Sequence, residues 1–361
     1  MKNAGKTPQH GGNIYHYSHK YGIPIGKIVD FSASINPLGP PKAAVAAIKA
    51  AIPSLVNYPD PDSTLIKDAL SVYLGVGKDC ILPGNGSTEL IYLIPRVLRP
   101  ERALLPVPSF SDYERSLTIA GCSIDYMQLR EKDGFRPDMD RFKASLSRAD
   151  IVLLCNPNNP TGTLIEKDIA LDMLKMTRKA GAFVVVDEAF IEYAPEHSIV
   201  KEASSASGVA VLRNFTKFYG MPGLRLGYLV ARPDLIKRFS KEAEPWSVNS
   251  LAHEAAAAAL SDPAYIEKSL SLFRREKDYL YNRLKKIDGV KPCPSSANFI
   301  LAKIDGSADD VVEKLASRGI LVRSCSNYKG LNGEYIRVAV KGRRDNRMLL
   351  DALEGMRGNS K

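Results

Sequence analysis

Short runs of almost purely apolar residues recur between residues 103 and 230, separated by stretches with apolar residues at helical spacing. A strand covered on both faces has no polar alternation, so these runs predict buried strands. They lie at residues 103–107, 151–155, 182–186, 209–213 and 226–230, with a more mixed run at 124–129. The segments between them, such as residues 166–180, favour helices. This alternation predicts an α/β fold with a parallel sheet covered on both faces.

The pattern changes after about residue 263. A long charged helix is expected at 264–286, followed by strands at 298–302 and 335–340 and helices at 308–318 and 344–357. Earlier, an extended segment is expected at 28–35, and helices at 42–52 and from a cap at Asp62 or Ser63 to Leu74. We expect three regions: an N-terminal arm with part of a small domain (1–50), a large domain (51–263) and a C-terminal small α+β domain (264–361).

Composition and charge argue against several classes of protein, among them nucleic-acid-binding and membrane-spanning proteins. The 361 residues carry a net charge of +10, but the basic residues are scattered, which argues against a nucleic-acid interface. The five cysteines are widely spaced without a CxxC pair, which favours free thiols in a reducing compartment. Residues 1–10 are polar, and no apolar run is long enough to span a membrane. The sequence therefore predicts a cytoplasmic protein without a membrane or nucleic-acid partner.

One lysine, Lys217, lies in an aromatic, glycine-punctuated segment at residues 214–228, with Arg225 eight residues further on. A lysine held in a desolvated place loses its proton more readily. The resulting neutral amine can form a Schiff base with a carbonyl cofactor. The alternative is a surface turn whose lysine points to water, which is the commoner fate of a lysine.

Polar residues follow several of the apolar runs. Gly86, Ser87 and Thr88 start a helix that continues to Leu98, and a helix N-terminus with small hydroxyl residues suits a phosphate. By itself this is only a capped helix start, and it lacks the lysine of a Walker loop. Residues 156–162 form an asparagine- and proline-rich loop at the end of a buried strand, where ligands bind in open α/β sheets. Asp187 ends another strand and is either an exposed loop start or a carboxylate held against a cofactor nitrogen.

The N-terminal segment combines His10 with the glycine pair Gly11-Gly12. The glycines permit backbone shapes and close approaches that other residues do not. A flexible terminal arm is the alternative. No carboxylate or cysteine stands near the histidines of this segment, so we expect no metal site.

Taken together, these stretches resemble the fold-type-I pyridoxal-phosphate enzymes of the class I/II aminotransferase group, in order and over nearly the whole chain. The resemblance implies a large domain with a mostly parallel seven-stranded sheet, a smaller α+β domain and a bound pyridoxal 5'-phosphate. It also implies a homodimer in which Tyr58 reaches the cofactor phosphate across the interface. Lys217 would carry the cofactor, Phe110 would stack on its ring, and Asp187 would pair with the ring nitrogen. The implied cofactor contacts are Tyr58, Gly86, Ser87, Thr88, Phe110, Asn159, Asp187, Asn214, Thr216, Lys217 and Arg225.

Two positions depart from the common pattern of this group. Many relatives have a tyrosine where this chain has Phe190, and a serine where it has Asn214. Both changes are compatible with cofactor binding. They weaken a default assignment as an aminotransferase.

Within the group, the chain is most similar to two subfamilies, histidinol-phosphate aminotransferase and the threonine-phosphate decarboxylase of cobalamin synthesis. Residues 10–13, 30–40, 187–191 and 216–219 look like the decarboxylase. The resemblance implies decarboxylation of L-threonine O-3-phosphate to aminopropanol phosphate, with Lys217 and Asp187 as the catalytic residues. The implied substrate contacts are His10, Gly11, Gly12, Asn36, Asn159, Arg323 and Arg337.

The two arginines would divide the substrate carboxylate and phosphate between them, unless either forms a structural ion pair. The alternatives are a histidinol-phosphate aminotransferase and a decarboxylase of serine phosphate, since one methyl group changes binding by only about 1–3 kcal/mol. A cofactor-binding regulator or a scaffold with a degenerate site is disfavoured. The chain has no room for a DNA-binding domain, and Lys217, Asp187, Asn159 and Arg225 are all present.

Overall fold

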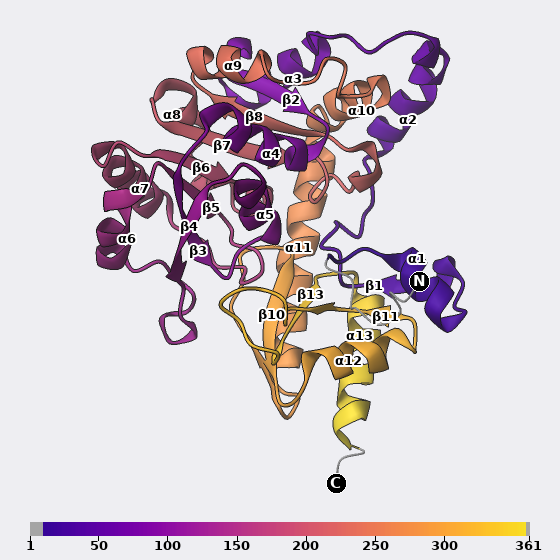
Figure 1. The fold of residues 1–361 in the computed structure, drawn as a ribbon. Helices are drawn as coiled ribbons and strands as arrows, with labels where there is room; N and C mark the ends of the chain where they lie inside the picture. Colours follow the sequence, from indigo (N-terminus) through magenta and orange to yellow (C-terminus); the bar gives the residue numbers. More distant parts are fainter. Residues whose placement is uncertain (1–9, 359–361) are drawn as a thin grey trace, which may run out of the picture.

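The structure, a computed structural model, describes residues 10–358. Residues 1–9, which belong to the expected N-terminal arm, lie outside the described residues. In Figure 1 the chain forms two parts, one built on a large sheet and the other on the C-terminal strands and helices. The long helix α11 (Pro263–Leu284) runs from the first part to the second.

The large sheet has seven strands in the order β2-β8-β7-β6-β5-β3-β4. β8 is antiparallel to both of its neighbours, whereas the pairs among β7, β6, β5, β3 and β4 are parallel. The predicted α/β fold with a mostly parallel seven-stranded sheet is therefore confirmed. The strands are β2 (Ile81–Gly84), β3 (Arg102–Val107), β4 (Ser123–Gln128), β5 (Ile151–Cys155), β6 (Phe183–Asp187), β7 (Val209–Asn214) and β8 (Gly227–Ala231).

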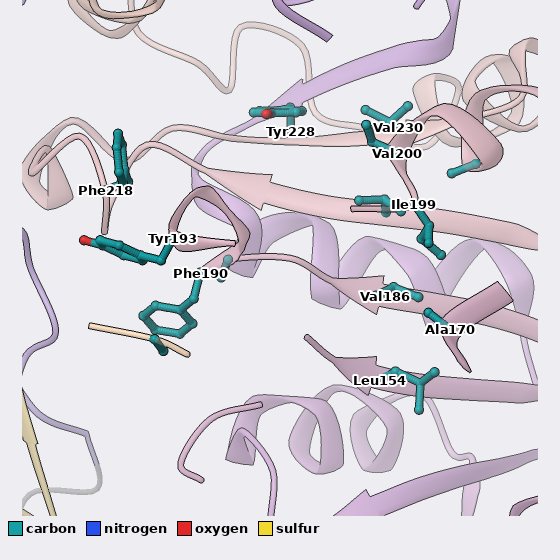
Figure 2. Packing of buried hydrophobic residues seen from close by; sticks show 14 of the residues in the cluster. Leu154, Ala170, Val186, Phe190, Tyr193, Ile199, Val200, Phe218, Tyr228 and Val230 are labelled. Atoms are coloured by element: carbon teal, nitrogen blue, oxygen red, sulfur yellow. The ribbon is translucent and has the colours of Figure 1, made fainter. Parts of the chain in front are cut away.

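The sheet separates two hydrophobic cores. In β5, Val152 and Leu154 belong to one core and Ile151 and Leu153 to the other, because successive side chains of a strand point to opposite faces. This is why the central strands are apolar at every position. Figure 2 shows part of the first core, with Leu154 and other strand residues facing a covering layer. The helices around the sheet are α3 (Thr64–Leu74), α4 (Gly86–Leu98), α5 (Ser111–Ile119), α6 (Met139–Ser145), α7 (Lys167–Lys179), α8 (Val200–Ser205), α9 (Pro233–Ser240) and α10 (Ser250–Leu260).

The second part is built on a four-stranded antiparallel sheet in the order β12-β13-β10-β9. A third core packs its strands against α11, α12 and α13. Its elements are β9 (Val290–Pro292), β10 (Phe299–Ile304), α12 (Ala308–Ala316), β12 (Arg323–Ser324), β13 (Tyr335–Ala339) and α13 (Arg343–Gly358). Every helix and strand expected after residue 263 is present.

The N-terminal segment joins this second part. β1 (Val29–Asp30) pairs in parallel with β11 (Ile320–Leu321), so only two residues of the expected extended segment 28–35 are strand. Before it, residues Ile14–Tyr21 form helix α1, which composition had not predicted, and α2 (Lys42–Ala51) packs against α10. Short 3₁₀ turns lie at Ile25–Lys27, Ile52–Val56, Lys78–Cys80, Glu131–Asp133, Leu146–Arg148, Ile191–Tyr193, Pro195–His197 and Pro222–Leu224.

None of the helices within residues 10–358 combines the length and the apolar character that a membrane span requires.

Candidate active site

A cavity of about 120 Å³ opens at the carboxyl ends of β5, β6 and β7. Nine of the eleven expected cofactor contacts line it, although they come from segments up to 138 residues apart. The strands bring them together because the carboxyl ends of parallel strands meet at one edge of a sheet. Its lining residues are Ser87, Thr88, Phe110, Tyr113, Cys155, Asn159, Asp187, Ala189, Phe190, Asn214, Thr216, Lys217 and Arg225.

Lys217 lies in the loop after β7 and stays partly accessible at the cavity wall. Burial, together with the positive charges of Arg337 and Arg225, lowers the pKa of Lys217 from 10.5 to about 8. Its Nζ lies 5.9 Å from the centre of the Phe190 ring. Upstream, Asn214 Oδ1 accepts a hydrogen bond from the backbone N–H of Thr216 at 3.0 Å, which fixes the turn. The lysine is therefore an activated amine in a desolvated site, not a solvent-facing side chain.

Phe190 lines the cavity, and Figure 2 shows it near two further aromatic side chains of the core, Tyr193 and Phe218. The rings of Tyr193 and Phe218 have their centres 5.2 Å apart. Phe190 contacts Phe299 of β10 at 5.0 Å, so the departure from the common tyrosine places an apolar ring between the two sheets. Of these aromatic side chains, Phe190 is the one that lines the cavity beside the lysine.

Asp187 ends β6 and is buried. Its Oδ1 accepts a hydrogen bond from the backbone N–H of Ala189 at 2.9 Å, and its Oδ2 accepts one from the Tyr113 hydroxyl at 2.6 Å. Burial raises the pKa of Asp187 to about 6, against the opposing effect of the hydrogen bond from Tyr113. The carboxylate faces the cavity, so the alternative of an exposed loop start is wrong.

The N-terminus of α4 and the Arg225 side chain form an anion cradle. Gly86 has a φ of +79°, and a Cβ atom at this position would lie 2.5 Å from Arg225 Nη2. A Cβ atom at Gly227 would lie 2.3 Å from the backbone nitrogen of Ser87. Glycine is therefore required at both positions to bring a guanidinium beside the free N–H groups of a helix start. Such an arrangement binds phosphate.

These residues fit pyridoxal phosphate. The cavity offers an amine for an aldehyde, a buried carboxylate for a ring nitrogen, a cradle for a phosphate and the Phe110 ring as a stacking face. Phe110 is held edge-to-face against Tyr113, with ring centres 5.6 Å apart.

Arg337 and Arg323 are paired residues of neighbouring antiparallel strands, and both are buried. Arg337 Nη1 donates a hydrogen bond to Asn159 Oδ1, and Nη2 donates one to the carbonyl oxygen of Ser32 at 2.9 Å. Its Nε has no hydrogen-bond partner within residues 10–358. The Arg323 guanidinium lies 5.3 Å from the ring centre of Tyr328, whose hydroxyl donates to Asn159 Oδ1 at 3.3 Å. The arginines are thus joined to the cavity through Asn159.

The N-terminal arm is docked beside the cavity. The backbone N–H of Gly12 donates to Ser32 Oγ at 2.8 Å, and a Cβ atom at Gly11 would lie 2.1 Å from the Ser32 carbonyl oxygen. The same carbonyl accepts from Arg337, so Ser32 joins the glycine pair to a buried arginine. His10 Nε2 lies 3.6 Å from Asp112 Oδ1, and its ring centre lies 6.0 Å from that of Phe110.

Asn36 and Tyr58 are among the expected contacts that do not line the cavity. Asn36 is buried, its amide nitrogen donates to the Phe218 carbonyl oxygen and Ser269 Oγ at 2.8 Å each, and its backbone N–H donates to the Lys217 carbonyl oxygen at 3.0 Å. It therefore supports the lysine loop, and its contact with substrate stays a prediction. Tyr58 is 81% exposed and its ring centre lies 5.1 Å from that of Trp246. Its reach into a partner subunit also stays a prediction.

Sequence reasoning missed the supporting residues Tyr113, Ser32 and Tyr328. Tyr113 carried one usable signal, since it follows Phe110 by three residues at a helix start and so shares a face with it. Ser32 and Tyr328 gave no signal, because their contacts come from residues that are distant in sequence.

Comparisons with known proteins agree with this geometry. The family described as aminotransferase class I and II matches residues 26–353. The threonine-phosphate decarboxylase of Salmonella typhimurium is 36% identical over 349 residues, covering 96% of this chain and 96% of that protein. The crystal structure of the histidinol-phosphate aminotransferase from Clostridium acetobutylicum aligns with a TM-score of 0.86 and 32% identity, covering 91% of this chain and 99% of that one. That of the L-threonine-O-3-phosphate decarboxylase from Porphyromonas gingivalis gives 0.82 and 29%, with 91% and 99% covered.

Proposed function

Because this chain belongs to the aminotransferase class I and II family, we propose that it is a pyridoxal-phosphate enzyme that decarboxylates L-threonine O-3-phosphate. The product would be (R)-1-amino-2-propanol O-2-phosphate, and the enzyme a carboxy-lyase of cobalamin biosynthesis. The observation that carries this proposal is the docked N-terminal arm, in which Gly11, Gly12 and Ser32 join the decarboxylase-like segments to Arg337. The likeness to the Salmonella decarboxylase supports it.

The cofactor supplies an aldehyde that condenses with amines and a ring that accepts electrons from a broken bond at the substrate Cα. The chain's own residues would hold it at four points. Lys217 provides the amine, Asp187 the acid at the ring nitrogen, Phe110 the stacking face, and the cradle of Gly86 and Arg225 the site for its phosphate.

The shifted pKa values suit these roles. Burial lowers the pKa of Lys217 to about 8, so a usable fraction of the amine is neutral near pH 7 and can take or give a proton at Cα. Asp187 must be ionised to balance a protonated ring nitrogen, and a neutral amide in its place would not compensate that charge.

Two buried arginines suit a substrate with two anionic groups. Arg323 and Arg337 are paired across neighbouring strands and reach the cavity through Asn159. Planar guanidinium groups bind carboxylate and phosphate with two hydrogen bonds each, which fixes orientation as well as affinity. Orientation decides the reaction, since the Cα bond held perpendicular to the cofactor ring is the one that breaks.

A product assay separates the candidates. Purified protein with bound cofactor is incubated with threonine phosphate, serine phosphate or histidinol phosphate, each with and without a 2-oxo acid acceptor. Release of carbon dioxide from threonine phosphate without an acceptor is the expected result. A keto product that requires the acceptor would instead establish an aminotransferase, the alternative favoured by the structural likeness to the Clostridium enzyme. Serine phosphate as the better substrate would correct the substrate only.

We also propose a homodimer in which Tyr58 of the partner subunit contacts the cofactor phosphate. Exposed apolar side chains support an interface: Trp246, whose ring lies against that of Tyr58, and Leu55, Val56 and Val72. Mixed dimers of Lys217→Ala and Tyr58→Ala chains test this, because one of their two sites would carry both intact residues. Activity above that of either homodimer is expected, and no gain would refute the shared site.

The division into regions 1–50, 51–263 and 264–361 remains our proposal, as does a cytoplasmic location. The latter is supported by five free cysteines, four of them buried.

A further inference from the structure

Tyr113 lies beneath the cavity in a place that none of the assigned roles explains. It comes from α5, whereas Asp187 ends β6, yet its hydroxyl lies 2.6 Å from Asp187 Oδ2. The side chain is only 1% exposed, and its ring supports Phe110 edge-to-face. A buried tyrosine needs a partner for its hydroxyl, and here the partner is the carboxylate expected at the ring nitrogen.

The direction of this hydrogen bond is fixed. Burial beside Asp187 raises the pKa of Tyr113 well above its ordinary value, so the hydroxyl keeps its proton and donates. The other carboxylate oxygen is occupied by the Ala189 N–H. Two donors on opposite oxygens therefore hold the carboxylate in one orientation, and both favour its ionised form over its protonated form.

The remaining groups around Asp187 do not replace this donor. Cys155 of β5 lies opposite Asp187 in the sheet, and burial raises the pKa of its thiol to about 12, so the thiol is neutral. The Lys217 amine attracts the carboxylate from across the cavity, and Glu188 opposes its ionisation. Glu192, a second buried acid that follows Asp187 in the chain, interacts unfavourably with it because both carry negative charge when ionised. Tyr113 is the side chain within residues 10–358 that hydrogen-bonds the carboxylate directly.

We propose that Tyr113 is a positioning residue that holds Asp187 as an oriented carboxylate, so that the proton they would otherwise share stays on the cofactor ring nitrogen. The inference rests on the proposed function, because it assumes that Asp187 faces that nitrogen. A protonated carboxyl next to an unprotonated ring would leave the ring a weaker electron acceptor. Tyr113 therefore acts through Asp187 on the reaction without touching the substrate.

The test uses Tyr113→Phe, which keeps the ring against Phe110 and removes only the hydroxyl. The matched control is Tyr228→Phe, since Tyr228 of β8 is buried to a similar degree but faces Arg213. The first readout is the Asp187 carboxyl resonance in cofactor-free protein labelled with ¹³C at aspartate, assigned with Asp187→Asn. We expect the Asp187 pKa to rise by about one pH unit in Tyr113→Phe and to stay unchanged in Tyr228→Phe.

The second readout uses the loaded enzyme. Tyr113→Phe should weaken cofactor binding about tenfold, shift the pH dependence of the bound cofactor's absorbance, and lower kcat with little change in KM. An unchanged Asp187 pKa, or a shifted one with wild-type cofactor affinity and spectrum, overturns the proposal. The first readout does not involve substrate, so wild-type protein that fails to release carbon dioxide from threonine phosphate overturns the proposed function separately.

Discussion

Replacing Lys217 with methionine should stabilise the protein when it is free of cofactor. Keeping Lys217 protonated in this cavity costs folding free energy, and the lowered pKa measures that cost. Burial, reinforced by Arg337 and Arg225, lowers the pKa of Lys217 from 10.5 to about 8. Since one pH unit corresponds to about 1.36 kcal/mol, this shift of the pKa sets the cost of protonated Lys217 at neutral pH, before screening, at about 3 kcal/mol.

Two effects reduce this figure. Lys217 remains partly accessible at the cavity wall, so solvent screens its charge, and its removal also removes an attraction that favours ionised Asp187. Methionine fills a similar volume without a charge. We therefore expect Lys217→Met to raise the free energy of unfolding by about 2 kcal/mol at pH 7.

The pH dependence gives the sharper test. Between pH 8 and 10.5 the unfolded lysine still binds a proton that the folded one has lost, so wild-type stability rises with pH across this window. The advantage of Lys217→Met should be complete below pH 8 and vanish above about pH 10.5.

Urea unfolding of cofactor-free protein at a fixed protomer concentration measures both effects. Lys175→Met, at an exposed position, is the control and should change stability by less than about 0.5 kcal/mol. A variant that is less stable than wild type at pH 7, or an advantage that does not depend on pH, would refute the desolvated lysine.

Three further variants test the cradle, the arm and the arginine. Gly86→Ala should weaken cofactor binding at least about tenfold in a fluorescence titration. Its positive φ strains any other residue, and the Arg225 guanidinium leaves no room for a Cβ atom. Gly333→Ala is the control and should leave binding unchanged, because a Cβ atom there meets open space. Ser32→Ala removes the acceptor for Gly12 and should raise KM for the phosphorylated substrate about tenfold, while cofactor affinity is unchanged. Arg337→Lys should raise that KM about 10- to 100-fold, since an ammonium cannot reproduce its hydrogen bonds to Asn159 and the Ser32 carbonyl; a wild-type KM would contradict its role.

The buried strands were predictable because the two cores impose a simple pattern. The side chains of a strand such as β5 point alternately into the two cores, so each of its positions is apolar. The edge strand β2 (Ile81–Gly84) is absent from the predicted strands, and its Pro83 and Gly84 are residues that disfavour a central strand. It pairs only with β8, and an edge position tolerates these residues. Helix α10 was missed because its alanine-rich sequence, buried between neighbouring helices, has no clear polar face.

The site followed the same logic. Residues at strand ends and helix starts were predictable, because fold geometry gathers them at one edge of the sheet. The residues that hold them were not. Tyr113 contacts a carboxylate 74 positions away, and Ser32 contacts Arg337 from 305 positions away. Only the docking of separate segments creates those hydrogen bonds, so no local pattern records them.

The two central groups of the site are shifted in opposite directions by one cause. Burial raises the pKa of Asp187 to about 6 and lowers that of Lys217 to about 8, so each is held closer to its neutral form than it would be in water. A ligand that takes up the amine covalently and places a positive charge beside the acid relieves both costs at once. The free energy that the cofactor-free protein loses by desolvating these two charged groups is therefore regained when the ligand binds. This gain favours such a ligand over any other small anion that fits the cradle. The instability of the cofactor-free site and its selectivity for the cofactor then have the same origin.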